Sequence, residues 1–366
     1  MSTIKINIVL FGIGNVGSAL IQQVLKSHDF FLNKRNIEVR FPIITNSTVA
    51  FFEKEGVRNE WETNFEQLAI PFKIGDIIEY VHNNELENLI AIDATASSEI
   101  ISHYIPLIQN GFNIVAANKK ANTLEYSFYT ELRENLEIFD KTFLYETNVG
   151  AGLPVVQTVR DLHFSGEEIT KIRGVFSGSL SYIFNRFSSE NSPFSTILID
   201  AEKNGFTEPD SREDLSGNDV ARKLLILARE IEQDFEFSDV QVSSLLLPDL
   251  NETHSRQEYS INKLLFDKPF EVAKITQAED NVLRYVGEFD VKSKKLEVKL
   301  VSVSKNTALG QLKGADNLIE IYTKSYGEIP IVIQGAGAGI EVTARGILSD
   351  LLKIADKIKS KELILA

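Results

Sequence analysis

The sequence predicts a two-domain α/β protein, and two patterns along its 366 residues support that prediction. In the first part of the chain, short apolar runs alternate with helical patterns, as in a parallel sheet whose strands are joined by helices. These runs are 4–11, 37–45, 89–93, 113–117 and 142–146. Later strand-like runs follow one another directly, which favours a mostly antiparallel sheet covered by helices on one face. These runs are 282–289, 295–304 and 317–324.

The two patterns also set the expected domain boundaries. We expect a first α/β domain at 1–147 and a second, α+β domain at 148–334. The mixed, polar segment 51–87 of the first domain is expected to hold two helices, or a helix and a loop. An apolar helical face recurs through 340–358, with Val342, Ile347, Leu351 and Ile354 on it. We expect this C-terminal helix to return to the first domain, which residues 335–366 then complete.

A glycine motif directly follows the first predicted strand. Residues 12–17 read Gly-Ile-Gly-Asn-Val-Gly, and a helical apolar stripe begins immediately afterwards. In such a unit the first glycine permits a tight turn, the second lets a pyrophosphate approach, and the third lets the helix pack on the strand. The helix N-terminus then offers N–H groups to phosphates. We interpret the motif as a Rossmann-type dinucleotide site, the alternative being a bare tight turn; its predicted contacts are Gly12, Gly14, Asn15, Val16 and Gly17.

The end of the second predicted strand does not choose between NAD and NADP. An acid there would bind the NAD ribose and a base would bind the NADP phosphate, but this chain has Asn46-Ser47. Lys54 and Arg58 come later and are placed either to reach a phosphate or to serve as solvated helix charges. The expected cofactor is therefore NADP or NAD.

Composition excludes several classes of protein. Hydrophobic content of 43% and charged content of 25% are those of a soluble globular protein, and no apolar run is long enough to span a membrane. A net charge of −14 argues against a nucleic-acid partner. The absence of cysteine excludes disulfides, thiolate metal sites and thiol catalysis. The chain opens on a strand-like run without a basic leader, so we expect a cytoplasmic location.

Five carboxylates gather in the stretch from Glu208 to Lys223, just before and within an apolar helical pattern. They belong to Glu208, Asp210, Glu213, Asp214 and Asp219. Asp219 and Lys223 are four residues apart and so share one helix face, about 6 Å along the axis. Ser216-Gly217-Asn218 supplies capping chemistry, and the helix dipole stabilises an anion in the first turn. The pair is either an ordinary surface ion pair or a lysine that binds a polar substrate and moves a proton.

Polar or small residues also follow three other predicted strands. Thr95 comes at the carboxyl end of a parallel strand, where such sheets touch their ligands. Lys119 and Lys120 follow the next strand and are either solvated loop charges or contacts to a cofactor or carboxylate substrate. The glycine-rich segment 148–154 can aim carbonyls at a cation or N–H groups at an anion, or form a close-packed domain junction.

Five motifs, in this order, resemble the homoserine dehydrogenase family over nearly the whole chain. They are Asn118-Lys119-Lys120-Ala121, the segment 146–154 (Glu-Thr-Asn-Val-Gly-Ala-Gly-Leu-Pro), the segment 174–184, the segment 208–223 and the segment 335–350. The resemblance implies reduction of L-aspartate 4-semialdehyde to L-homoserine with NADH or NADPH, a step of threonine and methionine biosynthesis. It also implies a homodimer formed through the antiparallel sheet.

The resemblance further implies a role for each matching residue. Lys223 would be the general acid, supported by Asp219, with Lys120 assisting near the nicotinamide. Glu208 and Asp214 would bind the substrate ammonium, helped by Gly178 and Ser179. Thr95 and Gly339 would line the cofactor. A monovalent cation, sodium or potassium, would lie on backbone oxygens of Glu146, Val149, Ala151 and Leu153.

The chain departs from the family pattern at three positions. Phe206 stands where a tyrosine is expected, Ser179 replaces a threonine, and Ala96 lies where a serine is common. Because the sequence ends after the closing helix, no appended regulatory domain or fused kinase is expected. The competing hypothesis is a catalytically inactive dinucleotide-sensing protein, and the presence of both Lys120 and Lys223 favours the enzyme.

Overall fold

The computed structural model describes residues 3–250 and 255–365 and divides into two compact units. The first unit comprises Met1–Gly152 and Gly339–Ala366, and the second comprises Leu153–Ala338. Both division points lie a few residues C-terminal to the predicted boundaries. Strand β13 (Ile331–Ala336) is hydrogen-bonded within the sheet of the second unit, so the chain leaves that unit only after β13 ends.

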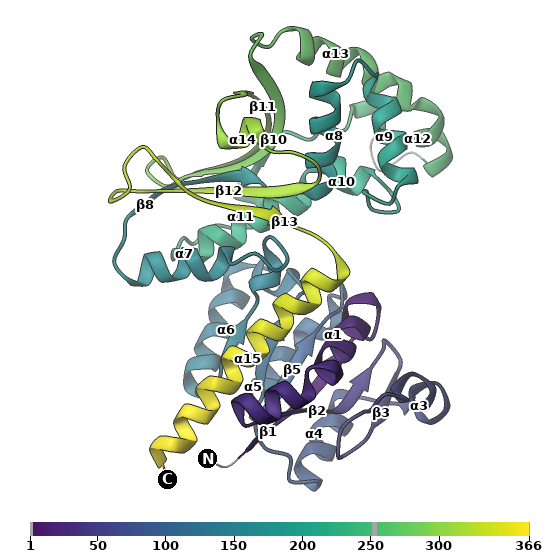
Figure 1. Ribbon diagram of the computed structural model, residues 1–366, viewed down its shortest axis with the longest axis vertical. Coiled ribbons are helices and arrows are strands. Elements are labelled where there is room, and N and C mark those ends of the chain that lie inside the picture. The colour runs from purple at the N-terminus through teal and green to yellow at the C-terminus, as the bar shows by residue number, and fades with distance from the viewer. Residues whose placement is uncertain (1–2, 251–254, 366) are drawn as a thin grey trace. The chain divides into compact units, whose positions relative to one another are not determined.

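The first unit is an α/β domain, as the sequence predicted (Figure 1). Its strands are β1 (Ile4–Phe11), β2 (Ile37–Thr45), β3 (Val49–Phe52), β4 (Ile70–Pro71), β5 (Leu89–Asp93), β6 (Asn113–Ala116) and β7 (Phe143–Leu144). Its α-helices are α1 (Asn15–Lys26), α2 (His28–Phe30), α3 (Trp61–Leu68), α4 (Ile74–Asn83), α5 (Tyr104–Gln109), α6 (Tyr126–Ile138) and α15 (Ile340–Leu365). Short 3₁₀ turns cover Glu99–His103, Lys120–Asn122 and Glu146–Asn148, and a π-helical turn covers Phe31–Arg35.

The strand order of this sheet determines where a ligand can bind. Within the described residues the order is β4-β3-β2-β1-β5-β6-β7, with β1 parallel to both β2 and β5. The chain builds outward from β1 on one side and then crosses to its other side at β5. In such sheets ligands bind beyond the carboxyl ends of the strands, at this switch point. Phe11, Thr45 and Asp93 end β1, β2 and β5 and therefore lie at that position.

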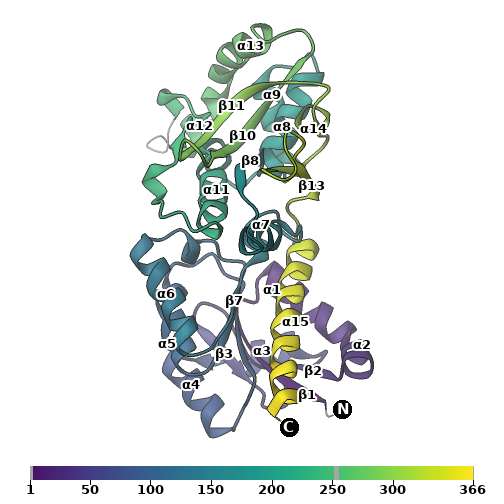
Figure 2. The same ribbon diagram turned by 90° about the vertical axis from the view of Figure 1, so that its left-hand side faces the viewer.

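Helices cover both faces of the sheet, and α15 packs beside α1 in agreement with the predicted return of the C-terminal helix (Figure 2). Ile347, Leu351 and Ile354 of the predicted apolar face are buried in the same core as strands β1 and β2, while Val342 is only half-buried. On the opposite face, α5 and α6 pack against each other. The core thus fixes the end of β1 from both sides.

The second unit is an α+β domain. Its strands are β8 (Ile169–Val175), β9 (Gln241–Val242), β10 (Asn281–Asp290), β11 (Lys295–Ser304), β12 (Asp316–Thr323) and β13. Its α-helices are α7 (Val155–Phe164), α8 (Gly178–Ser189), α9 (Phe194–Lys203), α10 (Arg212–Ser216), α11 (Asn218–Glu230), α12 (Arg256–Asn262), α13 (Asp267–Ile275) and α14 (Ala308–Gln311). Short 3₁₀ turns cover Phe237–Asp239, Pro248–Leu250 and Lys263–Phe266.

The sheet of the second unit is mostly antiparallel, as predicted. The described strands are ordered β13-β12-β8-β10-β11-β9, and only the short β9 pairs in parallel. Helices α8 and α11 pack on one face, where Gly287 of β10 leaves room for Phe176 and Val220. A Cβ on Gly287 would lie 3.1 Å from the Phe176 ring and 3.2 Å from Val220. The helix that carries Lys223 is therefore held directly against the sheet.

Several local expectations were wrong. The two helices expected in segment 51–87 are present as α3 and α4, but the antiparallel strands β3 and β4 were missed, because strands this short leave little alternating pattern. Strand β7 covers only Phe143–Leu144, and the following residues form a 3₁₀ turn instead. The N-cap of α11 is Gly217, with no side-chain cap, and its φ of 80° explains why a glycine stands there. Ser216 instead accepts the Asn218 N–H at 3.2 Å.

Within residues 3–250 and 255–365, no helix is both long enough and apolar enough to cross a bilayer.

Candidate functional site

The glycine turn after β1 has the geometry that its motif predicts for a phosphate site. Gly12 has a φ of +93°, and a Cβ there would lie 2.8 Å from Thr95. A Cβ on Gly17 would lie 2.0 Å from the Gly12 carbonyl oxygen, so only glycine allows α1 to pack this closely. Gly14 faces open space, with no atom within 4 Å of the position that a Cβ would take. Helix α1 has no side-chain cap and no acid in its first turn, so Asn15 and Val16 present N–H groups to an anion.

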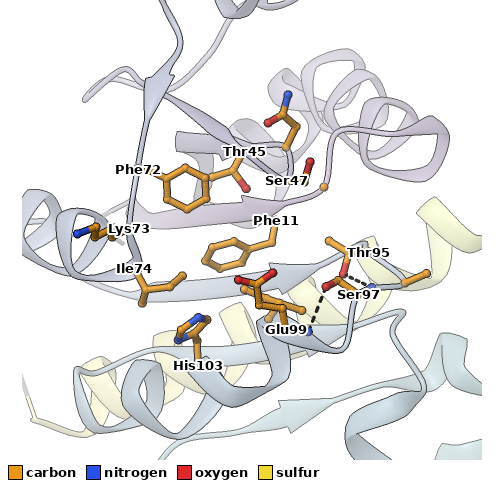
Figure 3. A pocket seen from close by; sticks show the side chains of 14 residues that line it. Phe11, Thr45, Ser47, Phe72, Lys73, Ile74, Thr95, Ser97, Glu99 and His103 are labelled. Atoms are coloured by element: carbon orange, nitrogen blue, oxygen red, sulfur yellow. Dashed lines mark hydrogen bonds between the residues drawn. The ribbon is translucent and has the colours of Figure 1, made fainter.

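A pocket of about 600 Å³ opens beside this turn in the first unit (Figure 3). That volume is typical of a site for a small organic ligand. The ends of β1, β2 and β5 contribute Phe11, Thr45 and Thr95, and Figure 3 shows Glu99 and His103 on the lower wall. The pocket therefore occupies the switch point of the sheet, where a dinucleotide is expected.

Two features of this pocket bear on which dinucleotide it accepts. Thr45 is 1% exposed, and within the described chain its enclosed Oγ1 has no hydrogen-bond partner. Lys73, at the start of α4, lines the pocket, whereas Lys54 and Arg58 are not among its lining residues. Lys73 is therefore the lysine placed to contact a ligand in this pocket, and the sequence pattern did not single it out.

Asp93 organises two loops, those of Thr95 and Asn118. It is 1% exposed, and its carboxylate accepts hydrogen bonds from the Thr95 N–H at 2.8 Å, the Tyr104 hydroxyl at 2.7 Å and the Asn118 amide at 3.0 Å. Burial raises the pKa of Asp93, while these hydrogen bonds lower it. Asn118 also donates to the Ser97 carbonyl at 2.7 Å. The network fixes the loop of Thr95 against the loop of Lys120.

Lys120 lies half-buried at the start of a 3₁₀ turn. Its backbone N–H donates to Asn118 Oδ1 at 3.2 Å, and its ammonium donates to Ser98 Oγ at 3.0 Å. A lysine held by a neutral hydroxyl keeps its positive charge available to a ligand. Lys119, the other lysine of the pair, supports the turn through its backbone carbonyl, which accepts the Thr123 hydroxyl at 3.3 Å.

Lys223 occupies the interior of the second unit. It is 7% exposed, which excludes the simple surface ion pair considered from the spacing. Its ammonium donates to the Phe176 carbonyl at 2.7 Å and lies 2.8 Å from Asp219 Oδ2 on the preceding turn of α11. The lysine is therefore held by one neutral and one charged oxygen, with its stem buried against the sheet.

Asp214 lies close to the same helix start, on α10. The Glu208 N–H donates to Asp214 Oδ2 at 2.9 Å, and the Ser179 hydroxyl also hydrogen-bonds to this carboxylate. Burial raises the pKa of Asp214 to about 6, and the charges of Glu208 and Asp219 act in the same direction. Three carboxylates and Ser179 thus converge around the start of α11, a concentration of negative charge that suits a cationic ligand.

Phe206 and Glu208 lie at the exposed edge of this cluster. Glu208 is exposed, so its carboxylate is accessible to a ligand. Phe206 stacks on the ring of Tyr182, with ring centroids 3.9 Å apart. Phe206 therefore supplies an apolar face but no hydroxyl. Gly178, at the start of α8, packs against Ala315, whose carbonyl oxygen would lie 3.0 Å from an added Cβ.

The segment predicted to bind a cation is buried from Glu146 to Ala151 and becomes exposed at Gly152. Gly150 and Ala151 have φ angles of 79° and 51°, so consecutive peptides turn in the left-handed region. The carbonyl of Glu146 accepts the Val149 N–H, and that of Leu153 accepts the Val155 N–H. Because a carbonyl oxygen has two lone pairs, these bonds leave room for a cation contact. Asp350 of α15, which is 1% exposed, anchors the loop by accepting the Glu146 N–H at 2.8 Å.

Comparisons with known proteins agree with this geometry. The family model described as homoserine dehydrogenase matches residues 154–352, and the one described as the homoserine dehydrogenase NAD-binding domain matches residues 12–146. The homoserine dehydrogenase of Saccharomyces cerevisiae is 35% identical over 98% of this chain and 100% of its own length. The chain belongs to the homoserine dehydrogenase family. Its first unit is accordingly an NAD(P)-binding domain.

Two further similar proteins differ in the share of their own length that matches this chain. The bifunctional aspartokinase/homoserine dehydrogenase of Haemophilus influenzae is 38% identical over 95% of this chain, which spans 42% of that protein's length. The crystal structure of a Candida auris protein of unknown function has a TM-score of 0.88 and 32% identity, covering 97% of this chain and 99% of that one. The fold similarity to the Candida auris protein therefore includes the residues of both units.

Sequence analysis missed several groups that hold the homoserine dehydrogenase residues in place. Asp93 and Tyr104 support Thr95 and Asn118, and Phe176 supplies the carbonyl that binds Lys223. Asn118 and Phe176 both lie in the family motifs, so their positions were visible in the sequence. The role of Phe176 was not, because a backbone carbonyl leaves no signature in the residue type, and the bonds of the Asn118 amide to Asp93 and Ser97 join residues more than 20 positions apart.

Proposed function

We propose that this chain is a homoserine dehydrogenase that reduces L-aspartate 4-semialdehyde to L-homoserine with NADH or NADPH. The observation that carries the proposal is the buried ammonium of Lys223, held by the Phe176 carbonyl and by Asp219. Burying a lysine ammonium costs desolvation free energy, which a carboxylate partner only offsets. Buried charged groups of this kind gather at functional sites.

The chemistry assigns Lys223 the role of general acid. A reduced nicotinamide, when bound, would supply the hydride that the aldehyde carbon accepts. Negative charge then develops on the aldehyde oxygen, and an ammonium beside it both stabilises that charge and delivers the proton. Asp219 orients the ammonium. After the transfer, Lys223 regains a proton from solvent, and the Asp219 carboxylate favours this return to the charged form. Lys120 would assist near the nicotinamide.

The carboxylates around Asp214 bind the substrate's α-ammonium. Glu208 is exposed, and Asp214 is half-buried with a hydrogen bond from Ser179. An ammonium ligand placed between them neutralises charges that otherwise repel one another. Gly178 and Ser179 open α8 and bring backbone N–H groups near the substrate. Phe206 removes one hydroxyl contact, so binding depends more heavily on the carboxylates.

The glycine turn would hold the dinucleotide. Gly12, Gly14 and Gly17 form the cradle, and the N–H groups of Asn15 and Val16 face the pyrophosphate. Thr95, fixed by Asp93, and Gly339, with a φ of +131°, are further contacts. Lys73, which lines the pocket, supports a contact to the adenosine half. NAD and NADP both remain candidates. A sodium or potassium ion on the carbonyls of Glu146, Val149, Ala151 and Leu153 belongs to the same proposal.

The assembly and location in the proposal are a cytoplasmic homodimer formed through the antiparallel sheet. On the face of that sheet opposite α11, Arg173 of β8 lies 3.5 Å from Glu288 of β10. Lys299 of β11 lies 3.7 Å from the same glutamate. Alternating charges of this kind can pair with themselves across a two-fold axis. Sedimentation analysis of the wild type and of Arg173→Glu tests this: the variant should become monomeric.

The alternative is a dinucleotide-sensing protein without activity. Absorbance at the reduced-nicotinamide band separates the two hypotheses. Wild-type protein incubated with homoserine and NAD or NADP should generate the reduced cofactor, and sodium or potassium should be varied in the same experiment. Cofactor binding without any absorbance change, with both dinucleotides and both cations, would support the sensor instead.

A further inference from the structure

Asn317 is a buried amide with one unsatisfied end. It is the second residue of β12, 0% exposed, between the end of β8 and Gly335 of β13. Its Oδ1 is enclosed and accepts no hydrogen bond from the residues that the structure describes. An enclosed polar atom without a partner lowers stability, so the residue is not explained by stability.

The other end of the same amide is bonded to the group that holds Lys223. Asn317 Nδ2 donates to the Phe176 carbonyl at 3.0 Å, and the Lys223 ammonium donates to that same oxygen at 2.7 Å. Phe176 directly follows β8, so the carbonyl projects from a strand end and is not part of the sheet ladder. Two donors from two different elements, β12 and α11, therefore converge on one acceptor.

Gly337 prevents the amide from moving. A Cβ on Gly337 would lie 2.0 Å from both Cγ and Nδ2 of Asn317, so the glycine lies in close contact with the amide. The contact restricts rotation of the side chain about its Cβ–Cγ bond. The amide is thus a fixed donor, whereas the lysine that shares its acceptor has a long flexible stem.

The Phe176 carbonyl does not need Asn317 as a donor. Lys223 already satisfies it, so an apolar side chain of the same shape at 317 would leave no buried group newly unpaired. It would also remove the unsatisfied Oδ1. What such a change would lose is the restraint on the direction of the carbonyl, and through it the position of the ammonium.

We propose that Asn317 is a positioning residue for the proton donor. Its rigid amide fixes the Phe176 carbonyl, and that carbonyl holds the Lys223 ammonium in line for the substrate oxygen. This inference rests on the proposed function, because it assigns Lys223 the proton transfer. Asn317 itself touches neither substrate nor reacting atoms in this account.

Replacement of Asn317 by leucine tests the restraint. We expect Asn317→Leu to lower kcat by about 10- to 100-fold, the size of effect that misplacement of a catalytic group produces. KM for homoserine should change by less than about two-fold, because the carboxylates that bind the ammonium are untouched. The melting temperature should be unchanged or higher. An unchanged kcat would overturn the proposal. A loss of kcat accompanied by a clear drop in melting temperature would also overturn it.

A second variant supplies a readout that a purely structural role cannot produce. In Asn317→Asp the neutral acid can still donate to the Phe176 carbonyl, whereas the ionised form cannot. Lys223 and Asp219 of α11 are the charged groups near this position. The ratio of variant to wild-type kcat, measured at saturating substrate, should rise as the pH falls. A ratio that is flat with pH contradicts the proposal.

Asn185→Leu is the matched control. Asn185 of α8 also donates its amide to a backbone carbonyl, that of Gly314, at 2.9 Å, but it does not contact Phe176 or Lys223 through a described bond. Its kcat should match the wild type. If the wild type itself shows no turnover, the proposed function fails, and a crystal structure of Asn317→Leu still decides the positioning. If that structure shows the Lys223 ammonium still bonded to a Phe176 carbonyl that has not moved, the positioning role is overturned. A displaced ammonium would support the positioning role.

Discussion

The backbone N–H of Glu208 donates to Oδ2 of Asp214 at 2.9 Å, so the main chain of one carboxylate residue holds the side chain of the other. This bond favours the ionised form of Asp214, yet burial is the larger effect and raises its pKa to about 6. At neutral pH Asp214 is charged, and a modest acidification removes that charge. The substrate-binding cluster is therefore pH-sensitive in a range where most aspartates are not.

We expect the affinity for homoserine to fall as the pH is lowered through about 6, the pKa of Asp214. An ammonium binds the ionised carboxylate and not the neutral acid, so kcat/KM should drop about ten-fold for each pH unit well below the pKa. Initial rates between pH 5 and 8 measure this. In Asp214→Asn the step should be absent and KM high throughout. A wild-type KM for homoserine that is constant over this range would contradict the assignment.

The same shift predicts that Asp214→Asn stabilises the free protein at neutral pH. The folded-state pKa of about 6 lies above the ordinary value of 3.8, so the folded state holds the proton more tightly. Stability is thus lost as the pH rises from about 4 to about 6, and the cost is full above that range. Removing the charge should recover up to about 3 kcal/mol at pH 8 and nothing near pH 4. Urea unfolding at both pH values checks this, and an equal difference at both would refute it.

We expect Lys223→Met to cut turnover by about 100-fold or more, the usual effect of losing a general acid. Binding of the dinucleotide, followed by fluorescence, should barely change, since the cradle lies in the other unit. Arg222→Met is the matched control. Arg222 is the adjacent cation of α11 and packs over the Phe237 ring at 4.6 Å. A similar loss of turnover in both variants would indicate a structural role for Lys223.

The sequence predicted the fold well where its patterns are long and local. The strand, glycine turn and helix from Ile4 to Lys26 were predicted because each glycine answers to a nearby steric requirement, such as Gly17 against Gly12. The strands β3 and β4 were missed because, at four and two residues, they are too short to show an alternating pattern. In the candidate site, Asp219 and Lys223 were singled out as a pair from their spacing along one helix, and the family resemblance supplied their expected roles. The Phe176 carbonyl and Asn317 were not, since the bonds that join them span up to 141 residues.

The glycines of the nucleotide cradle should separate binding from stability. In Gly14→Ala the new methyl meets open space within the protein but blocks the approach of a pyrophosphate, so KM for the dinucleotide should rise at least about ten-fold with little change in melting temperature. In Gly17→Ala the methyl meets the Gly12 carbonyl at 2.0 Å, so the variant should also lose about 1–3 kcal/mol of stability. Gly75→Ala, in helix α4 with open space around it, is the control and should leave KM unchanged. If Gly14→Ala instead lowers the melting temperature as much as Gly17→Ala does, the loop is not an open phosphate cradle.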